Sequence, residues 1–137
     1  MAFLVLTNAK VTVNAVDLSD HVKSVTVNYS AEILEDTTMG ATSKSRVAGL
    51  KDWSVEVEFI QDYAASEVDA TLFPLVGAAA FAISVVPVNT TVSATNPNFN
   101  GNCVLGEYSP VSGSVGELST VTVTFEGDGT LTRAVAP

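Results

Sequence analysis

Two segments of the chain alternate apolar and polar residues with a period of two, the pattern of β-strands that bury one face. In residues 23–33, an apolar side chain stands at every second position, with Ser, Thr, Asn and Glu between. Residues 53–60 repeat the pattern, with Trp53 first on the apolar face. We therefore predict that these two strands pair as a long hairpin with one buried face.

Shorter alternating segments stand on either side of this hairpin. Residues 11–18, "VTVNAVDL", predict two short strands around a turn at Asn14 and Ala15. Residues 120–127, "TVTVTFEG", predict a last strand with every second residue buried. Turn residues between these runs are typical of an antiparallel sheet.

One segment has the period of a helix instead. The sequence over about 66–73 places apolar residues three and four positions apart, and Ser66 is a fitting N-cap. We therefore predict one short α-helix in an otherwise β chain. The expected fold is an antiparallel β-sandwich or half-barrel, in a single domain over residues 1–137 with short terminal arms.

The segment between the two long strands, residues 35–52, shows neither strand alternation nor a helical stripe: its sequence is "EDTTMGATSKSRVAGLKD". We predict a long hairpin loop, of a length that is uncommon in compact domains unless the loop has a function. It holds three of the six basic residues of an acidic chain, so it can become ordered on an acidic surface of another copy. A merely flexible tip is the alternative. The candidate inter-subunit contact residues are Met39, Lys44, Arg46, Val47, Leu50 and Lys51.

Charge and composition narrow the class of protein. Fifteen Asp and Glu residues against six Lys and Arg residues give a formal net charge of −9, which argues against a groove that binds a phosphate backbone. Only 15% of the residues are charged and the mean hydropathy is +0.34, which is apolar for a soluble monomer. We therefore expect apolar surface to be buried in contacts between subunits.

No group of residues predicts catalysis or a bound cofactor. Glu56 and Glu58 are about 7 Å apart on one strand face, but acid-base catalysis needs carboxyl groups in different environments, so we expect a solvated acidic face. His21 is expected to be exposed in a turn, without a nucleophile beside it. Cys103 is expected to be a small core residue, and one Cys with one His cannot complete a structural zinc site. We predict no enzymatic activity, no metal and no cofactor.

The N-terminal sequence "MAFLVLTNAK" has only a short apolar run, without a basic region before it or a small-residue cleavage site after it. We therefore expect neither a secretion signal nor a membrane span here. The expectation is a protein that stays in the cytoplasm of the producing cell until it is assembled.

Three motifs carry a resemblance to a known family. They are "DLSDHV" at 17–22, "M-G-x-T-x-K-x-R-x-A-G-L-K-D-W-S" at 39–54 and "D-A-T-L-F-P-L-V-G" at 69–77. Together with the surrounding sequence over about 10–134, they resemble the small tail tube (major tail) proteins of long-tailed bacteriophages, particularly those of actinobacterial phages. Related virion proteins share some of these motifs.

The resemblance implies a structural virion protein. Such proteins form rings of six that stack into the tail tube, which carries the genome during DNA ejection. The implied partners are further copies of the chain and other virion tail proteins, while genomic DNA passes without specific binding. The long loop over 35–52 would bridge rings, and Glu32, Glu56 and Glu58 are the candidate acids facing the lumen.

Two other classes remain open from the sequence. A capsid decoration protein or a tail-surface adhesion domain would have a closed sandwich with a specific ligand face and would be a stable monomer or trimer. Another tail or neck structural protein is a further alternative. A small hydrolase is disfavoured because no pair of nucleophile and base is visible.

Overall fold

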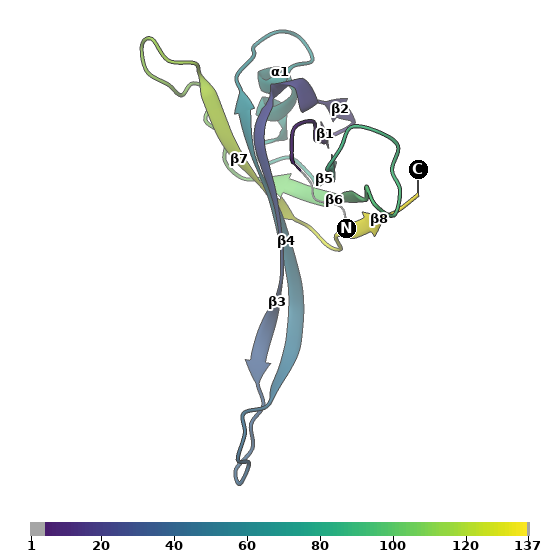
Figure 1. The fold of residues 1–137 in the computed structure, drawn as a ribbon. Coiled ribbons are helices and arrows are strands. Elements are labelled where there is room, and N and C mark those ends of the chain that lie inside the picture. Colours follow the sequence, from purple (N-terminus) through teal and green to yellow (C-terminus); the bar gives the residue numbers. More distant parts are fainter. Residues whose placement is uncertain (1–4, 137) are drawn as a thin grey trace.

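The molecule consists mostly of one curved antiparallel sheet (Figure 1). The structure is a computed structural model that describes residues 5–136. The sheet has eight strands in the order β2-β1-β5-β6-β7-β4-β3, and β8 pairs with β6. This confirms the predicted mainly β, antiparallel fold. The start of the expected N-terminal arm, residues 1–4, lies outside the described residues. The strands are β1 (Lys10–Val13), β2 (Val16–Asp17), β3 (Val22–Glu35), β4 (Arg46–Ile60), β5 (Phe81–Val86), β6 (Asn98–Leu105), β7 (Thr120–Gly127) and β8 (Thr132–Ala134).

The first hairpin depends on its turn residues. Asn14 and Ala15 both have positive φ, at 49° and 65°, which is the conformation of a two-residue hairpin loop whose twist matches that of the strands. Val13 pairs with Val16 across this turn, as predicted. Strand β1 then pairs with β5 and not with β3, so the two ends of the sheet remain separate.

The inner face of the sheet carries the core. The alternate residues of β4 from Trp53 to Phe59 are buried, as the sequence pattern predicts. The buried face predicted for the first strand of the hairpin is wrong, because Val25 and Val27 of β3 are only half-buried and Tyr29 and Ile33 are exposed. Strand β7 pairs with β4 and buries Val121, Val123 and Phe125 beside the β4 residues. The polar residues between these positions all point to the outer face because successive side chains of a strand alternate.

The predicted helix is present but shorter. Helix α1 spans Val68–Leu72 and continues as the 3-10 turn η2 (Phe73–Leu75), and the two bury Val68, Leu72 and Leu75 against the core. The predicted N-cap is wrong, because Ser66 has a φ of 63° and no side chain caps the helix. Among residues 5–136, no helix has the length and apolar character needed to cross a membrane.

Trp53 fills a space that two glycines leave open. Its side chain is 3% exposed, and its indole Nε1 donates a hydrogen bond of 3.1 Å to the carbonyl oxygen of Gly129. A methyl group on Gly127 would stand 2.5 Å from Trp53 Cε2, and one on Gly101 would stand 2.7 Å from Cζ2. Only glycine fits at these two positions while the indole keeps its place.

Strands β3 and β4 extend beyond the rest of the sheet as a two-stranded arm (Figure 1). Strand β7 pairs with β4 only from Ser54 to Ile60, whereas the pairing of β3 with β4 continues as far as Glu35 and Arg46. We call residues 31–51 the arm. Its two strands have only each other as neighbours in the sheet.

The predicted extent of the hairpin loop is wrong. Strand β4 already begins at Arg46, so only residues 36–45 connect the two strands, and they form the tip of the arm. Ala31 pairs with Lys51 and Ile33 with Ala48, so β4 contains one extra residue at this point. Such a β-bulge interrupts the alternation of the side chains, which is why the sequence pattern did not reveal this part of the strand.

Candidate functional site

The arm exposes apolar side chains far from the core. Met39 at the tip is fully exposed, and Leu50 on β4 is 82% exposed. Ile33, Leu34 and Val47 are also exposed along the arm. A two-stranded hairpin is marginally stable in water by itself, and clustered exposed apolar residues indicate a contact surface. The arm is therefore the first candidate for assembly.

The predicted contact residues divide between the tip and β4. Met39 and Lys44 lie in the tip, as predicted for a loop. The other four lie on β4, where Arg46 pairs with Glu35 and Lys51 with Ala31. The ion pairs found within residues 5–136 involve none of the basic residues of the arm. The remaining two predicted residues on this strand are Val47 and Leu50.

The outer face of the sheet is polar and acidic. Glu56 pairs with Thr26 on one side and Thr124 on the other, and Glu58 pairs with Ser24 and Thr122. Glu56 is exposed and Glu58 half-buried, so both carboxylates belong to one solvated face, as the alternation predicts. The next acid on this face is Glu126, which pairs with Ser54.

Glu32 does not join this group closely. It lies at the bulge of the arm, where a methyl group on Gly49 would stand 3.3 Å from Glu32 Cβ. Thr26, the partner of Glu56, is six residues away along β3, which is about 20 Å at the rise of a strand. The structure therefore separates Glu32 from Glu56 and Glu58.

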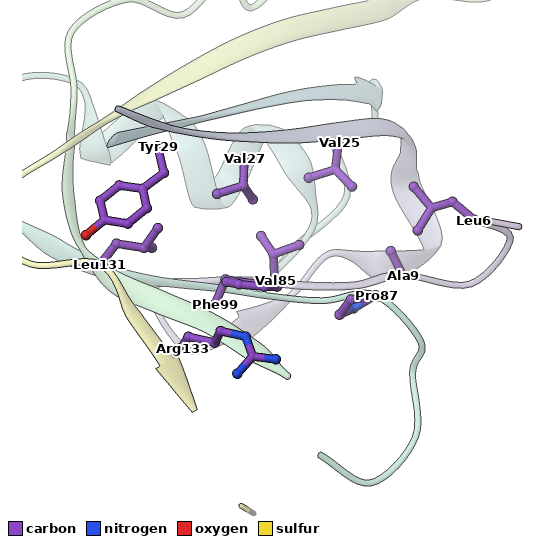
Figure 2. A pocket seen from close by; sticks show the side chains of 10 residues that line it. All are labelled: Leu6, Ala9, Val25, Val27, Tyr29, Val85, Pro87, Phe99, Leu131 and Arg133. Atoms are coloured by element: carbon purple, nitrogen blue, oxygen red, sulfur yellow. The ribbon is translucent and has the colours of Figure 1, made fainter. Parts of the chain in front are cut away.

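An apolar cleft of about 380 Å³ lies between β3 and the strands that face it, β5, β6 and β8 (Figure 2). Figure 2 shows Val25 and Val27 of β3 pointing toward Val85 and Phe99, with Arg133 at the opposite side. The cleft forms where the sheet curves back on itself, because β3 pairs with no strand other than β4. The remaining lining residues are Leu6, Ala9, Tyr29, Pro87 and Leu131.

His21 joins two separate segments of the chain. Its Nδ1 lies 2.7 Å from Asp20 Oδ1, and its Nε2 lies 2.9 Å from Asp62 Oδ2 and 3.2 Å from Glu67 Oε2. The side chain is only 14% exposed, so the predicted exposed turn histidine is wrong. Asp62 and Glu67 precede α1, about forty positions along the chain, and no local pattern could have indicated this contact.

The neighbouring carboxylates change the pKa of His21. Partial burial opposes the charged imidazole, but the hydrogen bonds to Asp62 and Asp20 outweigh it and raise the pKa of His21 above its ordinary value of 6.5. The hydrogen bond from the backbone N–H of Ala64, followed by that of His21, lowers the pKa of Asp62. Ligand atoms of Asp20, His21 and Glu67 lie within 4.8 Å of one another, but ion pairs already account for this grouping.

This cluster predicts a pH dependence of stability. A raised pKa in the folded state means that the contribution of His21 is fully present below pH 6.5 and is lost as the pH rises through the folded pKa. We expect the melting temperature of the wild type to fall more between pH 6 and pH 8 than that of His21→Gln, as followed by circular dichroism. Equal slopes for the two proteins would show that the cluster contributes nothing in this range.

Two further side chains, Cys103 and Tyr108, have a raised pKa. Burial raises the pKa of Cys103 to about 12, so its thiol stays protonated and unreactive at neutral pH. Burial also raises the pKa of Tyr108 to about 12; its hydroxyl donates to Asp69 Oδ1 at 2.9 Å and accepts from Gln61 Nε2 at 2.8 Å. These bonds attach the segment before β7 to the segment around α1.

The sequence matches no protein-family model and no curated protein. The fold is similar to that of a chain in a structure described as "Virion of native gene transfer agent (GTA) particle", with a TM-score of 0.72, 10% identity, and coverage of 93% of this chain and 96% of that chain. It is also similar to a chain in "Tail of empty GTA particle computed with helical refinement, C6 symmetry", with a TM-score of 0.65, 12% identity, and coverage of 84% and 83%. The likeness shows that this chain shares its fold with a chain of a gene transfer agent virion and with a chain of the tail of an empty gene transfer agent particle.

Proposed function

We propose that this chain is a structural virion protein, the tail tube (major tail) subunit of a long-tailed bacteriophage of the actinobacterial type. Copies would assemble in the host cytoplasm into hexameric rings, and the rings would stack into a tube through which genomic DNA is ejected. Its partners would be further copies of itself and other virion tail proteins. It would have no enzymatic activity.

The observation that carries this proposal is the arm. A protein that worked alone would gain nothing from a long hairpin that exposes Met39, Val47 and Leu50 to water, because exposed apolar area costs free energy that only a partner can recover. The arm also holds Lys44, Arg46 and Lys51 in a chain with a net charge of −9. A surface on another copy of the same acidic chain would satisfy both its apolar and its basic residues.

The similar folds support the tail in particular. One of the two structures is described as a tail, and its description includes C6 symmetry, which is the symmetry of a ring of six. The alignments cover most of this chain and of those chains, so the likeness extends beyond a shared motif to the whole sheet. A capsid decoration protein is the second candidate, and it would give discrete particles instead of tubes.

The direct test is the assembly state of the purified wild-type protein. We expect rings or tubes in negative-stain micrographs, and a sedimentation coefficient that rises with protein concentration. A protein that stays monomeric or trimeric at all concentrations, with no rings on the grid, would rule out the tube subunit and favour a decoration protein.

The acidic face gives a prediction about the lumen. If the outer face of β4 lines the tube, Glu56 and Glu58 repeat in every subunit and form a continuous negative wall that repels the DNA phosphates. We expect wild-type tubes to retain no labelled duplex DNA, and tubes of the Glu56→Lys and Glu58→Lys double variant to retain DNA at low salt and release it at high salt. The measurement is co-sedimentation of DNA with tubes at two salt concentrations.

The control is the Glu56→Gln and Glu58→Gln double variant, which removes the negative charge without adding a positive one. We expect little DNA retention by this control, because attraction requires Lys or Arg near the phosphates. Negligible retention by the Lys variant as well would mean that another face of the subunit lines the lumen.

A further inference from the structure

The apolar cleft of Figure 2 is not filled by the described residues. Its volume is about 380 Å³, and side chains around it keep contact with water, since Leu6 is 51% exposed and Tyr29 is 55% exposed. Val25 and Val27 of β3 are half-buried and pack against the edge of the core. The lining is apolar except for Tyr29 and Arg133. An apolar occupant would remove this surface from water and so stabilise the protein.

The segment that precedes β1 leads to one end of this cleft. Figure 2 shows Leu6 and Ala9 at the end nearest Val25. The backbone is held here by a hydrogen bond of 2.7 Å from the N–H of Asn89 to the carbonyl oxygen of Asn8. The chain is therefore anchored two residues away from Leu6, whose side chain already lines the cleft.

Residues 1–4, which lie outside the described part of the chain, connect directly to this end of the cleft. Their sequence is "MAFL", without a polar or charged side chain. Four residues in extended form span about 13 Å, and the four residue steps along β3 from Val25 to Tyr29 span about the same length. The segment thus matches the cleft in polarity and in reach.

The alternation of side chains selects one residue of this segment. In an extended chain, side chains two residues apart point to the same side. Leu6 lines the cleft, whereas Val5 is 79% exposed. An extended continuation would place Leu4 on the side of Leu6, toward Val27, and Phe3 on the side of Val5.

We infer that residues 1–4 dock in the apolar cleft of their own copy, with the side chain of Leu4 beside Val27. The competing occupant is the same segment of a neighbouring copy. The segment of the same chain has the advantage, because its connection to Leu6 holds it near the cleft at an effective concentration on the order of millimolar. This inference does not depend on the proposed function.

Docking of this segment would connect the two ends of the sheet. Residues 1–4 belong to the chain that enters β1, near one end of the strand order, whereas β3 is the last strand at the other end. Among residues 5–136, β3 pairs with no strand other than β4. A segment docked between β3 and the facing strands would hold β3 in place, and with it the base of the arm.

Two substitutions in this segment test which side chain docks. Leu4→Ser should lower the melting temperature by about 3 °C or more, because it places a polar group in the cleft and removes apolar contacts. Phe3→Ser is the matched control: it removes a larger apolar side chain from the opposite side and should change the melting temperature by less than about 1 °C. Circular dichroism at low protein concentration measures both. No change for Leu4→Ser, or an equal fall for Phe3→Ser, would overturn the docking of Leu4.

A disulfide tests both the cleft and the copy that supplies the segment. Cys103 is buried and its pKa is raised to about 12, so the introduced cysteines are the only reactive thiols. Leu4→Cys with Val27→Cys in one chain should form a disulfide within the monomer under mild oxidation, seen on a non-reducing gel and by mass. The control pair is Leu4→Cys with Thr26→Cys, since Thr26 is exposed on the outer face of β3 and pairs with Glu56.

Each outcome of the crosslink decides the inference. A disulfide within the chain that forms in much higher yield for the Val27 pair than for the Thr26 pair supports it. A disulfide-linked dimer as the main product of the Val27 pair would mean that the cleft takes the segment of a neighbouring copy. Equal yields for the two pairs, or no disulfide in either, would mean that residues 1–4 do not dock there. The last two results overturn the inference, and neither of them affects the proposed tube subunit.

Discussion

Replacing Trp53 with alanine is expected to lower the free energy of unfolding by about 3 to 5 kcal/mol, the range found when a large buried ring is removed. The indole is 3% exposed and lies against Gly101 and Gly127, which have no side chains that could move into the space. The hydrogen bond from Nε1 to the carbonyl oxygen of Gly129 is lost as well. Urea denaturation of the two proteins measures the difference.

The cross-strand partner of Trp53 provides a matched control. Tyr29 pairs with Trp53 but is 55% exposed, so Tyr29→Ala should cost much less than Trp53→Ala. Equal losses, or an unchanged midpoint for Trp53→Ala, would contradict the burial of the indole in solution.

Gly127→Ala tests the same space from the other side. A methyl group there would stand 2.5 Å from the indole, so Gly127→Ala alone should be strongly destabilising. In the Trp53→Ala background the same change should cost less, because the atoms that it would meet are gone. The double-mutant cycle over the two positions measures this coupling, and additive effects would show that the residues do not meet.

Removing the arm is expected to abolish assembly and leave the fold intact. Replacing residues 32–50 with Asn-Gly joins Ala31 to Lys51, which already pair, through a turn suited to a two-residue hairpin. The part of β4 that pairs with β7 stays complete. The free energy of loop closure changes by only about 0.6 kcal/mol for each halving of the loop length. We expect the deletion variant to melt cooperatively, at a melting temperature near that of the wild type. Its rings should not join into tubes.

The control for the arm keeps its length and charge. Thr38→Ala with Thr42→Ala changes two exposed polar residues of the tip, and we expect it to assemble as the wild type does. Normal tubes from the arm-deleted protein would show that the arm is not the connector. Loss of folding on deletion would instead assign the arm a role in the stability of the subunit.

The sequence alone determined the parts of the strands in which apolar and polar residues alternate. The buried set from Trp53 to Phe59, the β3–β4 hairpin and the turn at Asn14 and Ala15 were all predictable. Each depends on a local property, because a period of two or a positive φ is set by neighbouring residues. The sequence also shows that residues 35–52 hold three of the six basic residues, which indicates that this segment is a candidate contact site.

Other features were decided only by the tertiary structure. The sequence predicts a loop over part of the arm because a bulge near Gly49 breaks the alternation, and a bulge is detected only against the partner strand. His21 meets Asp62 and Glu67 across about forty residues, and nothing near it in the sequence shows this.

Val111, Val115 and Leu118 of the loop between β6 and β7 are exposed, and only the sheet places this loop at the end of the molecule opposite the arm (Figure 1). Local sequence sets which face of a strand is apolar. Strand order and curvature, which arise from contacts distant in sequence, decide which of those faces and loops lie side by side and which remain exposed for another copy.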